Sequence, residues 1–281
     1  MPQPRAVPVH RGRRRQGRRD DVPVRSRQRR WRQLGKPKYE DVKVQVGMAM
    51  SAPFYEWIAE FFAGRAARKN GAILAADFDY VERARREFAE AMIKEITFPA
   101  LSASDKNAAS MTIALAVERM VFARGSGQTL AAPAGFDAQK RWAACHFRFT
   151  IDGFDDACRR VTKVDSFTIK QTVIEHHVGG QREPIKVPSR IDFPNLVFSI
   201  PEADADPFFE HVAQRVGRGE KSGGLTGQLE VQDVTGKTLA TVSFLGADII
   251  SVTPTKSDSS SEELKQVRIE LMTEGMAFAY A

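Results

Sequence analysis

The feature that most constrains the fold of this chain is an internal repeat. The segment Pro53-Phe54-Tyr55-Glu56-Trp57 recurs as Pro207-Phe208-Phe209-Glu210-His211, at an offset of 154 residues (207 − 53). Each proline suits the first turn of a helix, where its fixed φ angle helps and its missing N–H is not needed. Apolar residues follow at helical spacing, which predicts an amphipathic helix in each copy. These residues are Phe54, Trp57, Ile58 and Phe61 in the first copy, and Phe208, Val212 and Val216 in the second.

The order of segments after the predicted helix repeats as well. At offsets of 155 or 156 residues, Gly71–Leu74 corresponds to Gly227–Glu230, Phe88 to Phe244, Pro99 to Pro254, and Met111–Leu115 to Val267–Leu271. Because the offset stays within two residues along this whole stretch, we predict that one domain occurs twice in the chain.

Most of the remaining segments have the pattern of strands. Alternating apolar and polar residues, typical of a sheet with one buried face, occupy Val42–Val46, Met111–Val117, Phe167–Lys170, Leu196–Ile200 and Val267–Leu271. Asp233–Lys237 predicts a hairpin turn. Asp77–Ala91 is rich in Glu, Arg and Ala and is expected to be partly helical. The predicted fold is mainly β, with one packed helix per unit, as two tandem antiparallel β-barrels whose closure protects the strand edges.

This ordered set of segments resembles the tail tube protein family of contractile phages. The same fold is shared with injection systems, including the haemolysin-coregulated protein of type VI secretion. Residues 144–281 look like one complete domain, with opening strands at Phe147–Gly153 and Phe167–Glu175. Lys36–Asp41, followed by Val42–Val46, resembles the strand that precedes the helix in such domains. The resemblance implies two tandem tail-tube-like domains.

The predicted domains are 36–122 and 144–281, joined by a linker at 123–143, which includes the glycine-containing segments Arg124–Gly127 and Ala131–Gly135. Residues 1–35 form an Arg-rich leader in the place where the first domain should have its opening strands. The leader is either disordered in front of a truncated domain or a coding sequence read in the wrong frame or from a wrong start. We favour the second interpretation, because misread GC-rich codons produce unpatterned Arg-rich sequence.

The leader carries the basic excess of the chain. It holds twelve arginines and two aspartates, for a charge of +10, whereas the whole chain has +7 and the remainder therefore −3. A nucleic-acid role is expected only through this leader, by counterion release, or for a cargo in a lumen. The alternative to a tail component is thus a non-catalytic tandem β-barrel binding module that associates with nucleic acid through the leader.

The resemblance implies a structural protein and not an enzyme. It predicts stacked rings with sheets joined edge to edge, and partners among other tube, baseplate or sheath proteins. Two fused copies predict either a trimer that forms a pseudo-hexameric ring or a hexamer. The expected location is the cytoplasm during assembly and then a virion tail or injection particle. The sequence has no apolar run of about 18–20 residues and no secretory signal, so no membrane role is expected. Tube subunit, initiator and baseplate adaptor remain open.

No catalytic, cofactor-binding or metal-binding residues are predicted, and no cofactor. Cys145-His146, Cys158 and His176-His177 lack the spacing of a ligand module. Asp152, Asp155 and Asp156 are interpreted as a solvated turn, because they lack the rest of a calcium-loop pattern. The glycine-rich run Arg218–Gly224 lacks the spacing of a phosphate-binding loop and is expected to connect a helix to a hairpin. Trp57 is expected in the core.

Overall fold

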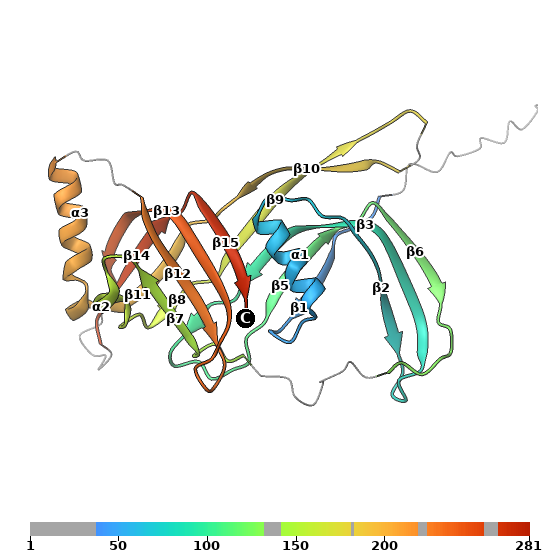
Figure 1. Cartoon of the computed structure of the whole chain (residues 1–281), viewed down its shortest axis with the longest axis horizontal. Coiled ribbons are helices and arrows are strands. Elements are labelled where there is room, and N and C mark those ends of the chain that lie inside the picture. Colours follow the sequence, from blue (N-terminus) through green and yellow to red (C-terminus); the bar gives the residue numbers. More distant parts are fainter. Residues whose placement is uncertain (1–37, 132–141, 181–182, 219–223, 256–263) are drawn as a thin grey trace, which may run out of the picture. The chain divides into compact units, whose positions relative to one another are not determined.

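Strands dominate the structure of this chain (Figure 1). The computed structural model describes residues 38–131, 142–180, 183–218, 224–255 and 264–281. Residues 36–281 form one compact unit. The elements are β1 (Val42–Val46), α1 (Ala52–Phe62), β2 (Lys69–Ala76), β3 (Glu82–Phe98), β4 (Leu101–Ser102), β5 (Met111–Ala116), β6 (Arg119–Arg124), β7 (Phe147–Ile151), α2 (Asp155–Cys158), β8 (Lys163–Val164), β9 (Phe167–His176), β10 (Ile185–Asp192), β11 (Leu196–Pro201), the 3₁₀ turn η2 (Glu202–Asp204), α3 (Asp206–Arg218), β12 (Leu225–Gln232), β13 (Thr238–Pro254), β14 (Gln266–Met272) and β15 (Gly275–Tyr280).

These strands form two antiparallel sheets. The seven-stranded sheet has the order β1-β5-β3-β9-β10, with β2 and β6 also paired to β3. The eight-stranded sheet has the order β4-β8-β11-β14-β13-β12-β7, with β15 also paired to β13. We call β1 to β6 the N-terminal half and β11 to β15 the C-terminal half. The predicted mainly β class is confirmed, with helices few in number.

The strand registers of the two halves agree. Gly71 lies opposite Phe88 in the β2–β3 pair, and Gly227 lies opposite Phe244 in the β12–β13 pair, an offset of 156 residues on both strands (227 − 71 and 244 − 88). The same offset relates β3–β5 to β13–β14 and β3–β6 to β13–β15. The β-bulges recur as well, since the register shift after Lys69 has its counterpart after Leu225.

One predicted element is wrong. Asp77–Ala91, expected to be partly helical, is a turn followed by β3, which begins at Glu82. The β3 strand pairs with β2 on one side and with β6 on the other. Local helix propensity from Glu, Arg and Ala is worth only tenths of a kcal/mol per residue, about the scale that tertiary pairing routinely overrides.

The two main helices begin where the prolines predict. Pro53 lies in the first turn of α1, and Pro207 lies in the first turn of α3. Trp57 is buried and donates a hydrogen bond from Nε1 to the carbonyl oxygen of Ala67 at 2.8 Å, so its predicted place in the core is confirmed. Phe208 is fully buried and packs edge-on against Phe198 of β11.

The segment after β6 follows the N-terminal half before it leaves the described residues. Gly125 donates to the carbonyl oxygen of Arg83, and Leu130 donates to that of Tyr80. The first part of the predicted linker is therefore bound along β3. Its residues 132–141, the leader and residues 219–223 of the glycine-rich run lie outside the described residues. Within the described residues, no helix combines the length and apolarity that crossing a membrane requires.

Candidate functional site

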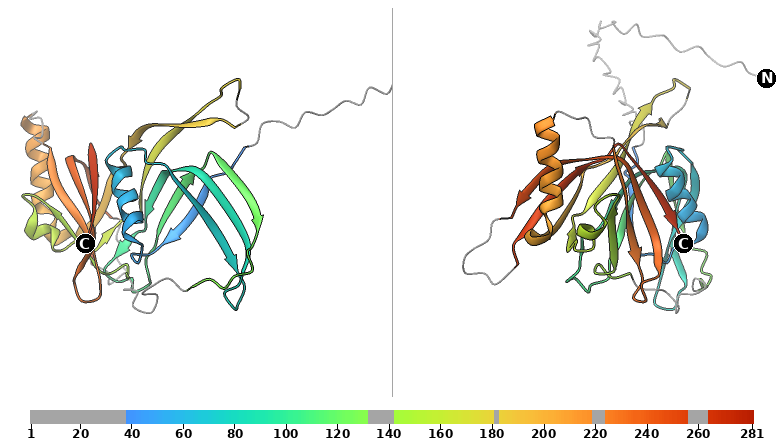
Figure 2. Two further views of the ribbon diagram at one scale, coloured as in Figure 1. Left: turned by 45° about the vertical axis from the view of Figure 1, so that its right-hand side comes forward. Right: turned by 60° about the vertical axis from the view of Figure 1, so that its left-hand side comes forward.

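The candidate functional site is the set of strand edges and sheet faces through which sheets can join. One such junction already exists inside the chain, because β9 pairs with β3 of the N-terminal half. Phe167 lies opposite Phe98, and their stacked rings are 4.8 Å apart between centroids. Two further views show the hairpin of β9 and β10, which we call the arm, extending along the N-terminal half (Figure 2).

A charged cluster anchors the outer strand of the arm. Arg68 donates to Glu118 Oε1 at 2.5 Å and to the carbonyl oxygen of Lys186 at 2.6 Å. The same Glu118 oxygen accepts a hydrogen bond from the backbone N–H of Lys186 at 2.7 Å. The backbone N–H and the carbonyl oxygen of Lys186 on β10 are thus both bound by side chains of the N-terminal half. Charge-assisted bonds of this kind are stronger than neutral ones and fix the position of the strand.

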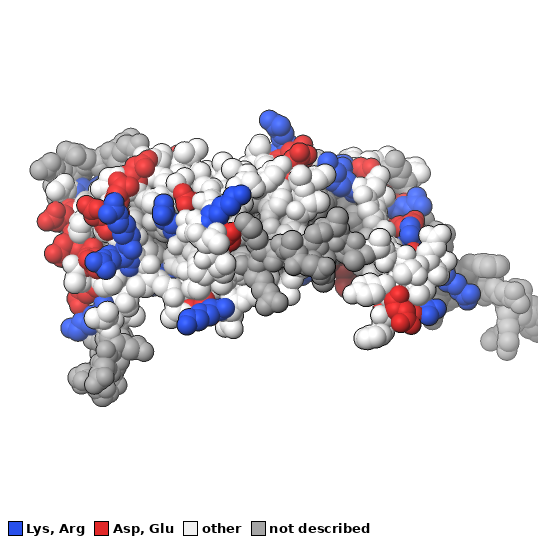
Figure 3. Space-filling view, turned by 60° about the horizontal axis from the view of Figure 1, so that its bottom comes forward, with Lys and Arg blue, Asp and Glu red and all other residues white. Residues whose placement is uncertain are grey.

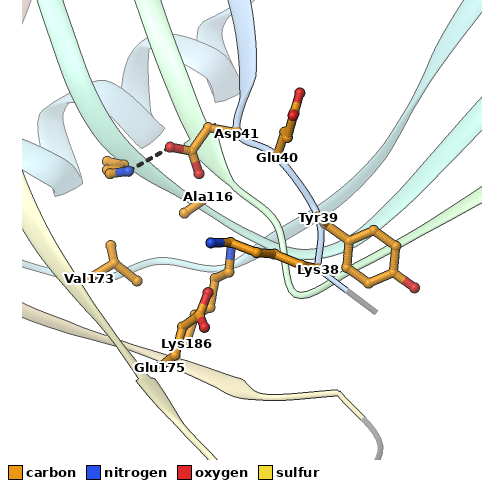
Figure 4. A pocket seen from close by; sticks show the side chains of 9 residues that line it. Lys38, Tyr39, Glu40, Asp41, Ala116, Val173, Glu175 and Lys186 are labelled. Atoms are coloured by element: carbon orange, nitrogen blue, oxygen red, sulfur yellow. Dashed lines mark hydrogen bonds and ion pairs between the residues drawn. The ribbon is translucent and has the colours of Figure 1, made fainter. Parts of the chain in front are cut away.

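A polar pocket of about 360 Å³ lies between the arm and the strands of the N-terminal half (Figure 4). Lys94 forms an ion pair with Asp41 at 2.5 Å on one side of this pocket. Ala116, Val173 and Lys186 line it from β5, β9 and β10. Because acidic and basic side chains mix around it, the pocket has no single charge that would select an ionic ligand.

A second junction joins α1 to β15 of the C-terminal half. Tyr55 stacks on Tyr280 and Phe278 with ring centroids 4.7 and 6.3 Å away, and Phe62 stacks on Phe278 at 5.7 Å. Tyr55 and Phe278 are only 7% and 6% exposed. Burial of aromatic side chains in this way is a strongly favourable contribution to the packing of α1 on β15.

The sheet of β2, β3 and β6 presents an exposed apolar surface. Phe122 on β6 is 68% exposed, and a shallow pocket of about 540 Å³ lies beside Phe88. In the C-terminal half the counterpart of Phe88 is covered, because Phe244 is fully buried and Phe149 of β7 lies 5.5 Å from it between ring centroids. Val121 on the same strand is also 40% exposed, and exposed apolar side chains gathered on one sheet are typical of interaction surfaces.

Charges of both signs are mixed over the molecular face in Figure 3. This view fits the mildly acidic balance of the chain outside the leader, since the residues after the leader have a net charge of −3. A surface without a broad basic region provides no electrostatic footprint for nucleic acid on that face.

The cysteines and histidines considered as a metal or catalytic site are dispersed. Cys158 is buried in α2, and burial raises the pKa of its thiol to about 12. Cys145 lies before β7 and is half-buried, whereas His176 ends β9. Among the described residues, no group of three or more His, Cys, Asp or Glu side chains could hold a metal ion. A thiol with a raised pKa is a poor nucleophile.

The aspartates of the predicted turn have structural neighbours. Asp152 accepts a hydrogen bond from the hydroxyl of Thr226. Asp155 and Asp156 lie in the first turn of α2, where acidic residues suit the positive end of the helix.

Part of the chain matches a family of known proteins. Residues 19–121 match the family model described as T4-like virus tail tube protein gp19. The match begins inside the Arg-rich leader and ends within β6. No curated protein matches the chain.

Several solved structures are similar at low identity. A chain of the anti-feeding prophage baseplate is 15% identical with a TM-score of 0.37, covering 48% of this chain and 91% of its own. A chain of the sheath-tube complex of the PVC extracellular contractile injection system is 13% identical with a TM-score of 0.36, covering 54% and 100%. Hcp1 from Salmonella typhimurium is 10% identical with a TM-score of 0.28, covering 66% and 87%.

These TM-scores are all below 0.5, so the assignment rests on the family match. That match confirms the structural, non-catalytic function predicted from the sequence. With residues 19–121 similar to the T4-like tail tube proteins, the chain is a tail tube component.

Proposed function

We propose that this protein forms rings in a phage tail or contractile injection apparatus, and that its two halves are tandem copies of one tail-tube-like barrel domain. The observation that carries the proposal is the shared register of the halves. Four strand pairs recur, three of them at one offset of 156 residues, together with their bulges. Pairs β1–β5 and β11–β14 complete the set, since Val42 opposite Leu115 corresponds to Leu196 opposite Leu271.

The contact between the halves supports ring formation. The strand β9, which precedes the C-terminal half in the chain, pairs with β3 and so extends the sheet of the N-terminal half. If each half can join its neighbour in this way, repeated heterologous contacts close into a ring when the rotations complete a full turn. Edge-to-edge pairing also satisfies the backbone groups that an open strand edge leaves exposed.

Two halves per chain restrict the symmetry of the ring. Three chains would supply six halves in a pseudo-hexameric ring, which would mate with a sixfold tube as an initiator or baseplate adaptor. Six chains would give a hexamer of double thickness. Proposed partners are tube, baseplate or sheath proteins, with assembly in the cytoplasm before incorporation into the particle.

Electron microscopy of the purified protein, combined with light scattering, tests this proposal. Rings of six barrels with the mass of three chains are expected, each chain contributing 31.3 kDa. Six chains per ring would support the double-thickness form. Protein that stays monomeric at every concentration, alone and with tube proteins, would contradict ring formation and favour the binding-module alternative.

A further inference from the structure

The intramolecular junction between α1 and β15 has a counterpart whose two members, on α3 and β6, lie apart within one chain; Arg86 lies over the ring of Phe122 at 6.0 Å from its centroid. At the offset of 154 residues, Tyr55 of α1 corresponds to Phe209 of α3 (209 − 55). At the offset of 156 residues, Phe278 of β15 corresponds to Phe122 of β6 (278 − 122). The two members of the equivalent contact therefore lie on different elements, Phe209 on α3 and Phe122 on β6.

Exposure separates the two sets of residues. Tyr55 and Phe278 bury each other and are 7% and 6% exposed. Their counterparts Phe209 and Phe122 are 36% and 68% exposed. The same position is thus covered where a neighbouring half exists and open where none does. Large aromatic side chains left open on both sides of a repeated contact indicate two complementary surfaces.

We propose that Phe209 of one copy packs on Phe122 of a second copy, so that chains join head to tail through α3 and β6. The occupant of each surface is therefore another copy of this chain. This inference rests on the proposed ring-forming function and names the contact that would carry it.

The geometry of the chain allows this contact. The helix α3 and the strand β6 lie at opposite ends of the coloured part of Figure 1, and the views of Figure 2 agree. One chain therefore presents both surfaces at once without using the same side for each. A contact between two different surfaces is heterologous and can add further copies until a ring closes.

Two neighbouring features extend the same surface. Arg124 of β6 corresponds to Tyr280 of β15. In the proposed contact the Arg124 guanidinium would therefore face the ring of Phe209, as the ring of Tyr280 faces Tyr55 within one chain. A cation over an aromatic face is a favourable replacement for a stacked ring. The edge of β13 at Ser251–Pro254 has only β14 beside it among the described strands, whereas its counterpart in β3 lies between β5 and β9. A docked copy would also cover this edge.

Two single variants and their mixture test the contact. Phe209→Glu removes the α3 surface and keeps the β6 surface, and Phe122→Glu does the opposite. Each variant alone is expected to lose the assembly and sediment as a monomer of 31.3 kDa. Mixed in equal amounts, they are expected to form a dimer and stop there, because each dimer has one intact contact and two damaged ends.

A matched control uses Val234→Glu, since Val234 is 69% exposed and lies in the turn between β12 and β13. This variant should assemble as the wild type does. Far-ultraviolet circular dichroism and thermal unfolding of the three variants establish that they fold, which exposed positions permit.

The outcomes separate this inference from the proposed function. Wild-type protein that never assembles would contradict ring formation itself. A wild type that assembles, with variants at Phe209 and Phe122 that assemble equally well, would leave the ring intact and overturn the α3–β6 contact. A mixture that stays monomeric while each single variant is folded would also overturn it.

Discussion

Glu90 and Gly246 occupy the same backbone position in the two halves, and both have a positive φ angle, 54° for Glu90 and 59° for Gly246. The offset of 156 residues relates them (246 − 90), and each lies in the bulge where β3 or β13 shifts register against its neighbouring strand. The bulge therefore requires the left-handed region in both halves, although only one of them has glycine there. A side chain costs about 1 kcal/mol or more in that region.

We therefore predict that Glu90→Gly stabilises the protein, by about 0.5–1 kcal/mol in chemical unfolding at fixed protein concentration. The variant relieves the backbone strain, and the exposed ion pair of Glu90 with Arg68 at 3.4 Å contributes little. Gly246→Ala should destabilise by about 1–2 kcal/mol, because the left-handed angle opposes a side chain. A Cβ at this position would also lie 2.7 Å from Oε2 of Glu274. Equal stabilities of Glu90→Gly and the wild type would contradict strain at this bulge.

A second pair of glycines predicts unequal effects of the same substitution. A Cβ on Gly227 would meet the carbonyl oxygen of Thr150 on β7 and the ring of Phe244. Gly227→Ala should therefore destabilise by about 2–3 kcal/mol, because the backbone of β7 and the buried ring of Phe244 must both shift. A Cβ on Gly71 would meet only the ring of Phe88, at 2.6 Å, and that ring is partly exposed and can turn aside.

Gly71→Ala should consequently cost under about 1 kcal/mol. Thermal or urea unfolding of both variants beside the wild type checks the difference. If the two substitutions cost the same, the strand β7 would not be what makes the C-terminal half less tolerant.

Acid should destabilise the protein through Glu82. A hydrogen bond from Arg85, with a further one from the Ser126 hydroxyl, lowers the pKa of this carboxyl from 4.5 to about 2. Because the folded-state pKa is depressed, the contribution is present above the unfolded-state pKa and is lost as pH falls through the folded value. The loss should therefore develop between pH 4.5 and about pH 2.

Glu82→Gln should be less stable than the wild type at pH 7 and should lose less stability across that window. Urea unfolding at several pH values measures both slopes. Glu87→Gln is the control, because Glu87 is exposed and its contact with Arg85 is long, at 3.5 Å. Parallel slopes for wild type and Glu82→Gln would show that other carboxyls dominate acid unfolding.

The arm should loosen when its anchoring cluster is removed. In Arg68→Ala, the Glu118 carboxylate and the carbonyl oxygen of Lys186 lose their shared cationic donor. Hydrogen bonds to charged groups are worth about 1.5–3 kcal/mol, so hydrogen exchange at the Lys186 amide should accelerate by roughly tenfold to a hundredfold.

Arg83→Ala is the matched control for the arm, because Arg83 also pairs with a carboxylate, that of Asp77, but is 66% exposed. It lies near the start of β3, whereas β9 pairs with the last residues of that strand. In the Arg83→Ala variant, the Lys186 amide should exchange at the wild-type rate. An unchanged rate in Arg68→Ala would mean that β-ladder pairing alone holds the arm.

Local patterns predicted the elements that repeat. The prolines at positions 53 and 207 marked both helices, and alternation marked β1, β5, β9, β11 and β14. The prediction for Asp77–Ala91 was wrong because the residues of β3 are exposed in places where a strand usually shows a buried face, so alternation is weak there. Composition then favoured a helix that pairing with two strands overrides.

Pairings between the halves could not be predicted from local patterns. Nothing within Phe167–His176 indicates that this strand pairs with β3 instead of with a strand of the C-terminal half. The aromatic surfaces at Phe122 and Phe209 were missed for the same reason, because exposure depends on which neighbour is present. Comparing equivalent positions at offsets of 154 and 156 residues could have singled them out, since both members of each pair are aromatic.

The pairing of β3 with β9 also has a consequence for biosynthesis. Phe98 emerges from the ribosome well before its strand partner Phe167, so the growing chain carries an uncovered β edge throughout that interval. Contacts of such long sequence separation form slowly, and nascent sheets in this state are prone to aggregate. Translation speed and chaperone supply should therefore influence the soluble yield of this protein.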